Sequence, residues 1–158
     1  MTGNAMHIEI TDASFADAGI IAEFNQQMAQ ETENKALDTA TINAGVERMI
    51  TDNSLGRYLV AREETGRIVG CLGITYEWSD WRNGLFWWIQ SVYVLPEARE
   101  NGVFTAMYQQ VRDLCQATDN ACGIRLYVER DNDRAYRTYV RLGMVETEYR
   151  LMEEEFGE

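Results

Sequence analysis

Residues 92–104 read VYVLPEARENGVF, and this stretch decides the fold. It joins an apolar segment, residues 85–94, to a short polar loop and then to a second apolar pattern. Pro96 lacks a backbone N–H and therefore marks the point where a strand stops pairing. After Gly102, apolar residues beginning with Phe104 recur at helical spacing. The stretch predicts a buried strand that passes through a tight loop into an amphipathic helix.

The loop of this stretch has the features of an anion-binding turn. A loop that enters a helix directs several backbone N–H groups at one point, beside the positive end of the helix dipole. Gly102 would let a phosphate approach the backbone, and Arg99 could add a charge-assisted bond. The alternative is a tight turn that only caps the helix. A nucleotide P-loop is disfavoured, because no Gly-Lys-Ser/Thr follows.

A second informative stretch, residues 132–144, reads NDRAYRTYVRLGM. Asn132 and Tyr139 are seven residues apart and so share a helix face, with the small Ala135 between them. A tyrosine with a pKa of about 10 stays protonated at neutral pH and can act as a general acid. The alternative is that Tyr136 and Tyr139 are partly buried packing residues.

The rest of the chain alternates between the two periodicities. Strands are expected at residues 7–10, 58–62, 67–76, 85–94, 124–128 and 144–151. Helices are expected at residues 15–30, from Asp38 or Thr39 to about Ile50, from Gly102 to about Cys115, and at 132–142. Ser14 and Asp17 resemble a capping box for the first helix. The order predicts a mixed α/β class in a single domain over residues 1–158.

The amino-acid composition limits which partners and cofactors we expect. The 158 residues carry 14 basic and 26 acidic side chains, a net charge of −12. This balance argues against nucleic acid as a partner and favours cationic ligands. Three cysteines and one histidine show no metal-ligand spacing, and the cysteines are expected to be reduced. Without a signal peptide or an apolar run of about 20 residues, the sequence predicts a cytoplasmic protein with no membrane partner.

The order strand, proline, Arg-x-x-Gly, helix, strand, then Asn-x-x-Ala-x-x-x-Tyr-x-x-x-Gly-Met resembles the GNAT superfamily of acyl-CoA-dependent N-acetyltransferases. The resemblance covers nearly the whole chain, and residues 92–144 carry its specific part. It implies a mostly antiparallel twisted sheet of six to seven strands, with a splayed parallel pair and four flanking helices.

The resemblance also implies acetyl-CoA as co-substrate, with no metal. The strand end would offer backbone groups to the acetyl and pantetheine portions, and the loop would bind the pyrophosphate. The residues so implied are Ser91, Val92, Tyr93, Val94, Arg99, Glu100, Asn101, Gly102, Val103 and Phe104. Asn132, Ala135 and Tyr139 would contact the pantetheine arm and the sulfur. Tyr139 would be the general acid.

Two positions depart from the family pattern. The pyrophosphate loop usually ends on a small residue, where this sequence has Phe104. Either its ring must turn away from the phosphates or the geometry of the loop must shift. Polyamine-acetylating members often carry a glutamate where this sequence has Gln90. Because glutamine cannot act as a base at neutral pH, the base must be another residue or a water molecule.

In this fold the acceptor pocket lies between the first inter-helix segment and the central strands, here residues 30–34 and 77–81. The candidate acceptor-binding residues are Glu31, Glu33, Trp78 and Gln90, and the candidate bases are Glu33 and Glu77. Carboxylates beside tryptophans suit an organic ammonium group, through charge and cation–π contact. The alternative is that these acids are solvated surface residues.

The expected activity is transfer of an acetyl group to a small cationic amine by direct attack. Two alternatives stay open: a catalytically silent acyl-CoA-binding or interaction module, and a protein N-terminal or lysine acetyltransferase. Trp78, Trp81, Trp87 and Trp88 leave room for a homodimer interface, since aromatic residues are enriched at such surfaces.

Overall fold

A computed structural model of the protein describes residues 7–157. Its elements are β1 (Glu9–Asp12), a 3₁₀ turn η1 (Phe15–Asp17), α1 (Ala18–Glu33), α2 (Thr39–Thr51), β2 (Gly56–Arg62), β3 (Ile68–Ser79), β4 (Gly84–Val94), a 3₁₀ turn η2 (Pro96–Ala98), α3 (Val103–Gln116), β5 (Ala121–Leu126) and α4 (Asp133–Arg141). Packing divides the chain into two compact units, residues 1–126 and 127–158. The expectation of a single domain over residues 1–158 stays a prediction.

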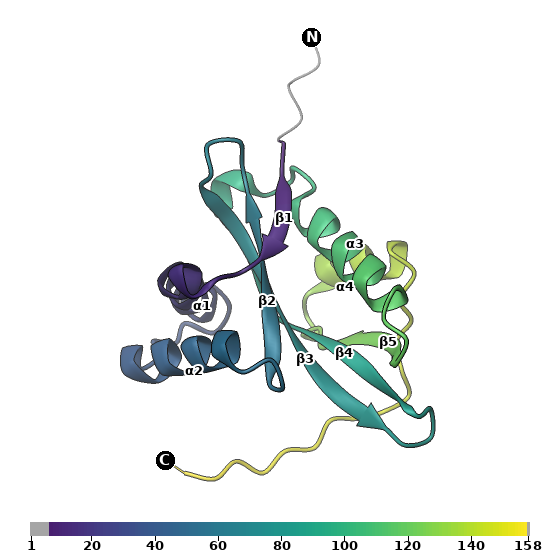
Figure 1. The fold of residues 1–158 in the computed structure, drawn as a ribbon. Helices are drawn as coiled ribbons and strands as arrows, with labels where there is room; N and C mark the ends of the chain where they lie inside the picture. The colour runs from purple at the N-terminus through teal and green to yellow at the C-terminus, as the bar shows by residue number, and fades with distance from the viewer. Residues whose placement is uncertain (1–6, 158) are drawn as a thin grey trace. The chain divides into compact units, whose positions relative to one another are not determined.

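The first unit contains one five-stranded sheet in the order β1-β2-β3-β4-β5 (Figure 1). Its pairs are antiparallel except β4–β5, which is parallel. The predicted parallel pair is therefore confirmed. Helices α1 and α2 cover one face of the sheet and α3 covers the other (Figure 1).

The two faces of the sheet carry separate apolar layers. On the α1–α2 side, Ile21 and Phe24 pack with Val46 and Val60, and each is at most 1% exposed. On the other side, Met107 of α3 lies against β3, where a Cβ on Gly70 would meet its methyl carbon at 3.4 Å. Burying such side chains is the main favourable term in folding. The sheet is thus fixed from both sides before any ligand binds.

The expectation of six to seven strands is wrong, because the part of the chain that the structure describes forms five. The missing strand is residues 144–151, which are irregular, with Val145 84% and Tyr149 78% exposed. Their alternating sequence suits a strand, but a strand forms only where a neighbour supplies hydrogen bonds and burial. No described strand pairs with this segment.

Several boundaries also differ from expectation. The β3–β4 hairpin extends through Glu77 to Ser79, which pairs with Gly84, so the expected loop at 77–84 shortens to residues 80–83. Backbone hydrogen bonds keep residues 77–79 in the strand although their side chains are mostly polar, and the side-chain pattern alone does not reveal this pairing. β5 begins at Ala121, opposite Leu85, rather than at residue 124. None of the helices within residues 7–157 has the length and apolar character that a bilayer crossing requires.

The start of α1 confirms the predicted capping interaction. The Asp17 carboxylate accepts a hydrogen bond from the Ser14 amide at 2.9 Å. It also pairs with Arg62 of β2 at 2.9 Å. Burial would raise the pKa of Asp17, but the Ser14 amide and the Arg62 guanidinium outweigh it and lower that pKa. One carboxylate thus joins the first helical turn to the sheet.

Candidate functional site

The second half of β4 stays paired with β3 but not with β5. Pairing with β5 ends at Ile89, opposite Leu126, while β4 continues to Val94. Against β3, the register passes from Gly73 opposite Gln90 to Cys71 opposite Tyr93, so β4 holds one extra residue. Ser91 lies in this bulge with a φ of +52°. Beyond Ile89, one edge of β4 has no partner strand within residues 7–157, and the binding of a ligand by its backbone groups stays a prediction.

The loop after β4 is held in one conformation by its own side chains. Asn101 donates through Nδ2 to the carbonyl oxygens of Ala98 at 3.1 Å and Arg99 at 2.9 Å. Glu100 and Gly102 both have left-handed backbones, with φ of +65° and +76°. Strained backbone of this kind persists only where its surroundings fix it, and it clusters at functional sites.

Helix α3 begins directly at this loop. Its first intrahelical bond runs from the Ala106 amide to the Gly102 carbonyl at 2.9 Å. The amides of a first helical turn have no intrahelical acceptor and attract anions. A Cβ on Gly102 would have nothing within 4 Å, so the approach to its backbone is open. These features are compatible with the predicted anion cradle, and binding of an anion there stays a prediction.

The Phe104 side chain contacts another side chain of α3. Its half-buried ring lies 6.2 Å from that of Tyr108, one helical turn later. Residues four apart on a helix stack in this way. The contact places the ring beside Tyr108, while its orientation toward a bound phosphate and any effect on co-substrate affinity stay predictions.

The Arg99 side chain is fixed at three points. Its Nε donates to the Val94 carbonyl at 2.9 Å, and its Nη2 donates to the Glu31 carboxylate at 2.8 Å. Its guanidinium carbon lies 5.4 Å from the centre of the Tyr93 ring. Arg99 and Glu31, predicted for the co-substrate and the acceptor respectively, therefore form one ion pair.

Sequence reasoning missed Gln27 and the hydroxyl of Tyr93. This hydroxyl lies 3.0 Å from Oε1 of Gln27 and 3.1 Å from Oε1 of Glu31. Burial and its hydrogen bond to Glu31 raise the pKa of Tyr93, so the hydroxyl stays a donor. The four-residue spacing of Gln27 and Glu31 on α1 was the available signal.

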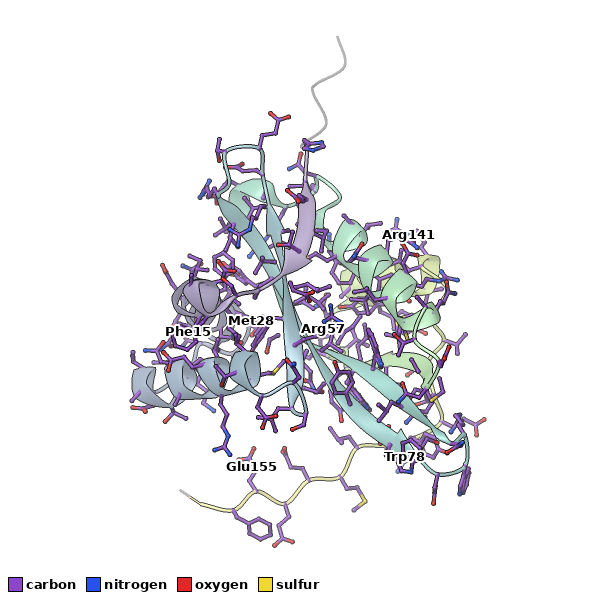
Figure 2. All side chains as sticks on the ribbon, in the orientation of Figure 1. Phe15, Met28, Arg57, Trp78, Arg141 and Glu155 are labelled. Atoms are coloured by element: carbon purple, nitrogen blue, oxygen red, sulfur yellow. The ribbon has the colours of Figure 1, made fainter. Side chains whose placement is uncertain are left out.

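Among the described residues, the other acceptor candidates form no hydrogen bond or ion pair with this group. Glu33 is exposed at the end of α1, and Gln90 donates to the Thr75 hydroxyl at 3.1 Å. Trp78 is 57% exposed near the turn of the β3–β4 hairpin, well away from Met28 of α1 (Figure 2). The structure does not bring Trp78 together with α1.

Glu77, on β3, accepts hydrogen bonds from two neighbouring side chains. Its Oε1 accepts hydrogen bonds from Arg125 at 2.6 Å and from the Trp88 indole at 3.2 Å. Trp87, one of the four tryptophans considered for a dimer interface, is only 4% exposed and packs edge-on to Tyr76. Trp87 therefore belongs to the protomer's interior.

The remaining site residues lie in the second unit, residues 127–158. Asn132 caps α4, accepting a hydrogen bond from the Ala135 amide at 3.1 Å. Gly143, with a φ of +103°, ends the helix in a Schellman motif, in which the Met144 amide donates to the Tyr139 carbonyl at 3.0 Å. Burial raises the pKa of Tyr139. The contact of these residues with the co-substrate stays a prediction.

Within residues 7–157 no three potential metal ligands come together. In the first unit, the candidate site consists of backbone groups of β4, the loop into α3, and the polar group around Arg99.

Comparisons with known proteins place the chain in a family. A comparison with curated sequences finds no match. Among solved structures, "a possible acetyltransferase from Clostridium difficile 630" is 42% identical, covering 96% of this chain and 99% of that one, with a TM-score of 0.89. A ribosomal-protein-alanine N-acetyltransferase from Brucella melitensis biovar Abortus 2308 shares the fold at 16% identity, with coverage of 96% and 100% and a TM-score of 0.76.

A predicted acetyltransferase from Clostridium acetobutylicum, solved with acetyl-CoA, is 18% identical over 94% of this chain and 96% of that one, with a TM-score of 0.77. The profile of the Acetyltransferase (GNAT) family matches residues 20–144, which is most of the chain. The chain therefore belongs to the GNAT acetyltransferase family.

Proposed function

We propose that this protein transfers the acetyl group of acetyl-CoA to a primary amine, and that the acceptor is a small cationic amine. The observation that carries the proposal is the bulged end of β4, which is open beyond Ile89 and leads into the loop before α3. Family membership supplies the reaction class. The local backbone supplies a way to hold a thioester and a diphosphate.

Residues 99–104 fit the diphosphate of acetyl-CoA. The Gly102 backbone is open to approach, and the first turn of α3 favours negative charge. The Phe104 ring lies beside Tyr108 on the same helix, which is consistent with a ring directed away from the phosphates. These features support binding of a diphosphate even on a chain of net charge −12, because local amides and Arg99 act at short range.

In the proposed reaction, the amine nitrogen forms a bond to the carbonyl carbon and the carbon–sulfur bond breaks. Backbone N–H groups of residues 91–94 would stabilise the oxyanion. Tyr139 would give its proton to the departing thiolate, and its raised pKa keeps that proton in place at neutral pH. Asn132 and Ala135 would position the pantetheine arm.

The amine must also lose a proton. At pH 7, exposing the lone pair of an amine with a pKa near 10.4 costs about 4 to 5 kcal/mol. Since two donors already occupy Oε1 of Glu77, the exposed Glu33 or a water molecule is the better candidate for the base. Glu31 and Gln90 would contact the acceptor on this side of the sheet.

The test is an acceptor screen in which released thiol is measured with acetyl-CoA as donor. The panel should contain diamines and polyamines, neutral amines, acidic amino acids, and peptides with a free N-terminus or a lysine. The proposal predicts the highest kcat/KM for small cationic amines. Turnover of peptides alone would support a protein acetyltransferase. Binding of acetyl-CoA without turnover of any amine would support a silent binding module.

A further inference from the structure

The ion pair between Glu31 and Arg99 joins the two halves of the proposed site. Glu31 lies near the end of α1, on the proposed acceptor side, and Arg99 lies in the loop proposed for the diphosphate. Their charged atoms are 2.8 Å apart, and their side chains are 40% and 45% exposed. Both groups are therefore accessible to solutes while they are paired.

The bonds around this pair allow it to open without displacing the backbone. Arg99 keeps its bond from Nε to the Val94 carbonyl at 2.9 Å, which holds the guanidinium at the end of β4. The guanidinium is planar and rigid, so it keeps this orientation while the Glu31 side chain turns away about its own bonds, and its Nη groups can then donate to another anion. A diphosphate oxygen presents the same kind of acceptor as the Glu31 carboxylate.

The hydroxyl of Tyr93 has two acceptors within hydrogen-bond distance, one on Glu31 and one on Gln27. It carries one hydrogen but lies 3.1 Å from Oε1 of Glu31 and 3.0 Å from Oε1 of Gln27. It can donate to only one of them at a time. If Glu31 leaves, Gln27 still accepts the bond, so no buried donor loses its partner.

We infer that Glu31 competes with the diphosphate of acetyl-CoA for Arg99, and that co-substrate binding releases the Glu31 carboxylate for the cationic acceptor. This inference rests on the proposed function and adds a coupling between the two substrates. Bound co-substrate strengthens acceptor binding, and by linkage the acceptor strengthens co-substrate binding by the same factor. Glu31 acts on the co-substrate through Arg99 and is in that respect a positioning residue.

The competition makes an unusual prediction for Glu31→Gln. Removing a carboxylate that only supports the loop would weaken co-substrate binding. Removing a competitor should instead tighten binding of coenzyme A by about two- to fivefold, the range expected for a partly exposed ion pair. Titration calorimetry with coenzyme A measures this without requiring an acceptor.

Glu97→Gln provides the matched control. Glu97 lies in η2, two residues before Arg99, and pairs with Arg67 at 2.6 Å with similar exposure. Both variants remove one negative charge beside the same loop. A general charge effect would tighten binding equally in both, whereas the competition predicts a larger gain for Glu31→Gln.

A double variant completes the test. In an Arg99→Gln background, Glu31→Gln should no longer change coenzyme A affinity, because the competition has been removed. Unchanged or weaker binding by Glu31→Gln alone, in a variant with wild-type thermal unfolding, would overturn the inference while leaving the proposed function intact. Failure of the wild-type protein to bind coenzyme A would overturn both.

Discussion

At the scale of single residues, Tyr139 is the side chain on which the proposed chemistry depends most. Tyr139→Phe removes one hydroxyl and keeps the ring, so the fold should be unaffected. We expect thiol release from acetyl-CoA to slow by about 10²-fold or more, the usual contribution of a general acid. A loss below about threefold would remove Tyr139 from the chemistry.

The pH profile gives a second readout on Tyr139. A general acid must be protonated, and burial raises the pKa of Tyr139 above its usual value of about 10. Activity should therefore show no decline from Tyr139 between about pH 7 and about pH 10, and it should fall only above that range. A basic decline below pH 10 in the wild-type protein that disappears in Tyr139→Phe would show that Tyr139 loses its proton below pH 10, which would contradict the raised pKa of Tyr139 but not its role as the acid.

At the scale of elements, the loop into α3 depends on the left-handed backbone of Gly102. Nothing lies within 4 Å of an added Cβ, so Gly102→Ala tests the φ of +76° and not a clash. We expect a loss of about 1 kcal/mol in the free energy of unfolding, and weaker binding of coenzyme A, because a Cβ disfavours this conformation.

Gly45→Ala is the matched control for Gly102→Ala. Gly45 lies inside α2, and an added Cβ there also meets nothing within 4 Å. Since alanine is the better helix former, this variant should gain about 0.5–1 kcal/mol in urea unfolding. Changes of the same sign in both variants would show that the Gly102 backbone is not strained by a side chain.

The contact between the start of α1 and β2 depends on Asp17, which pairs with Arg62. Its pKa is lowered in the folded state, so its contribution is fully present above the unfolded value near 3.8 and is lost as pH falls through the folded value. Asp17→Asn should destabilise the protein by about 2 kcal/mol at neutral pH, the cost of losing a charge-assisted bond and a cap. The difference should shrink in urea unfolding at about pH 3.

Asp12→Asn tests whether this effect is specific. Asp12 also pairs with an arginine of β2, Arg57, but its side chain is 62% exposed. An exposed pair contributes about 1 kcal/mol or less. A loss in Asp12→Asn as large as that in Asp17→Asn would mean that burial and the capping bond of Asp17 add nothing.

At the scale of the whole molecule, the sequence predicted turns and helix ends better than it predicted contacts between residues that are far apart in the chain. The strand-to-helix passage at Pro96 and Gly102 and the end of α4 at Gly143 depend on backbone restrictions that a sequence displays directly. The Glu31–Arg99 pair depends on residues 68 positions apart, and no periodicity reveals it. The prediction of a strand at 144–151 was wrong for the same reason. The alternating pattern suits a strand, but a strand also requires a neighbouring strand to pair with, and the sequence does not reveal one.

The net charge of −12 should affect the two substrates in opposite directions. A cationic acceptor is attracted by the field of the molecule and acetyl-CoA is repelled by it, and salt screens both effects. Raising the ionic strength from about 0.01 M to about 0.5 M should therefore increase KM for a polyamine. Over the same range, KM for acetyl-CoA should fall or stay level, because the long-range repulsion weakens while the short-range contacts of the loop are screened less. Steady-state kinetics at fixed pH, with a neutral amine as the control acceptor, measure both constants. A parallel rise in both, with the neutral amine rising equally, would show that the whole-molecule field does not select the acceptor.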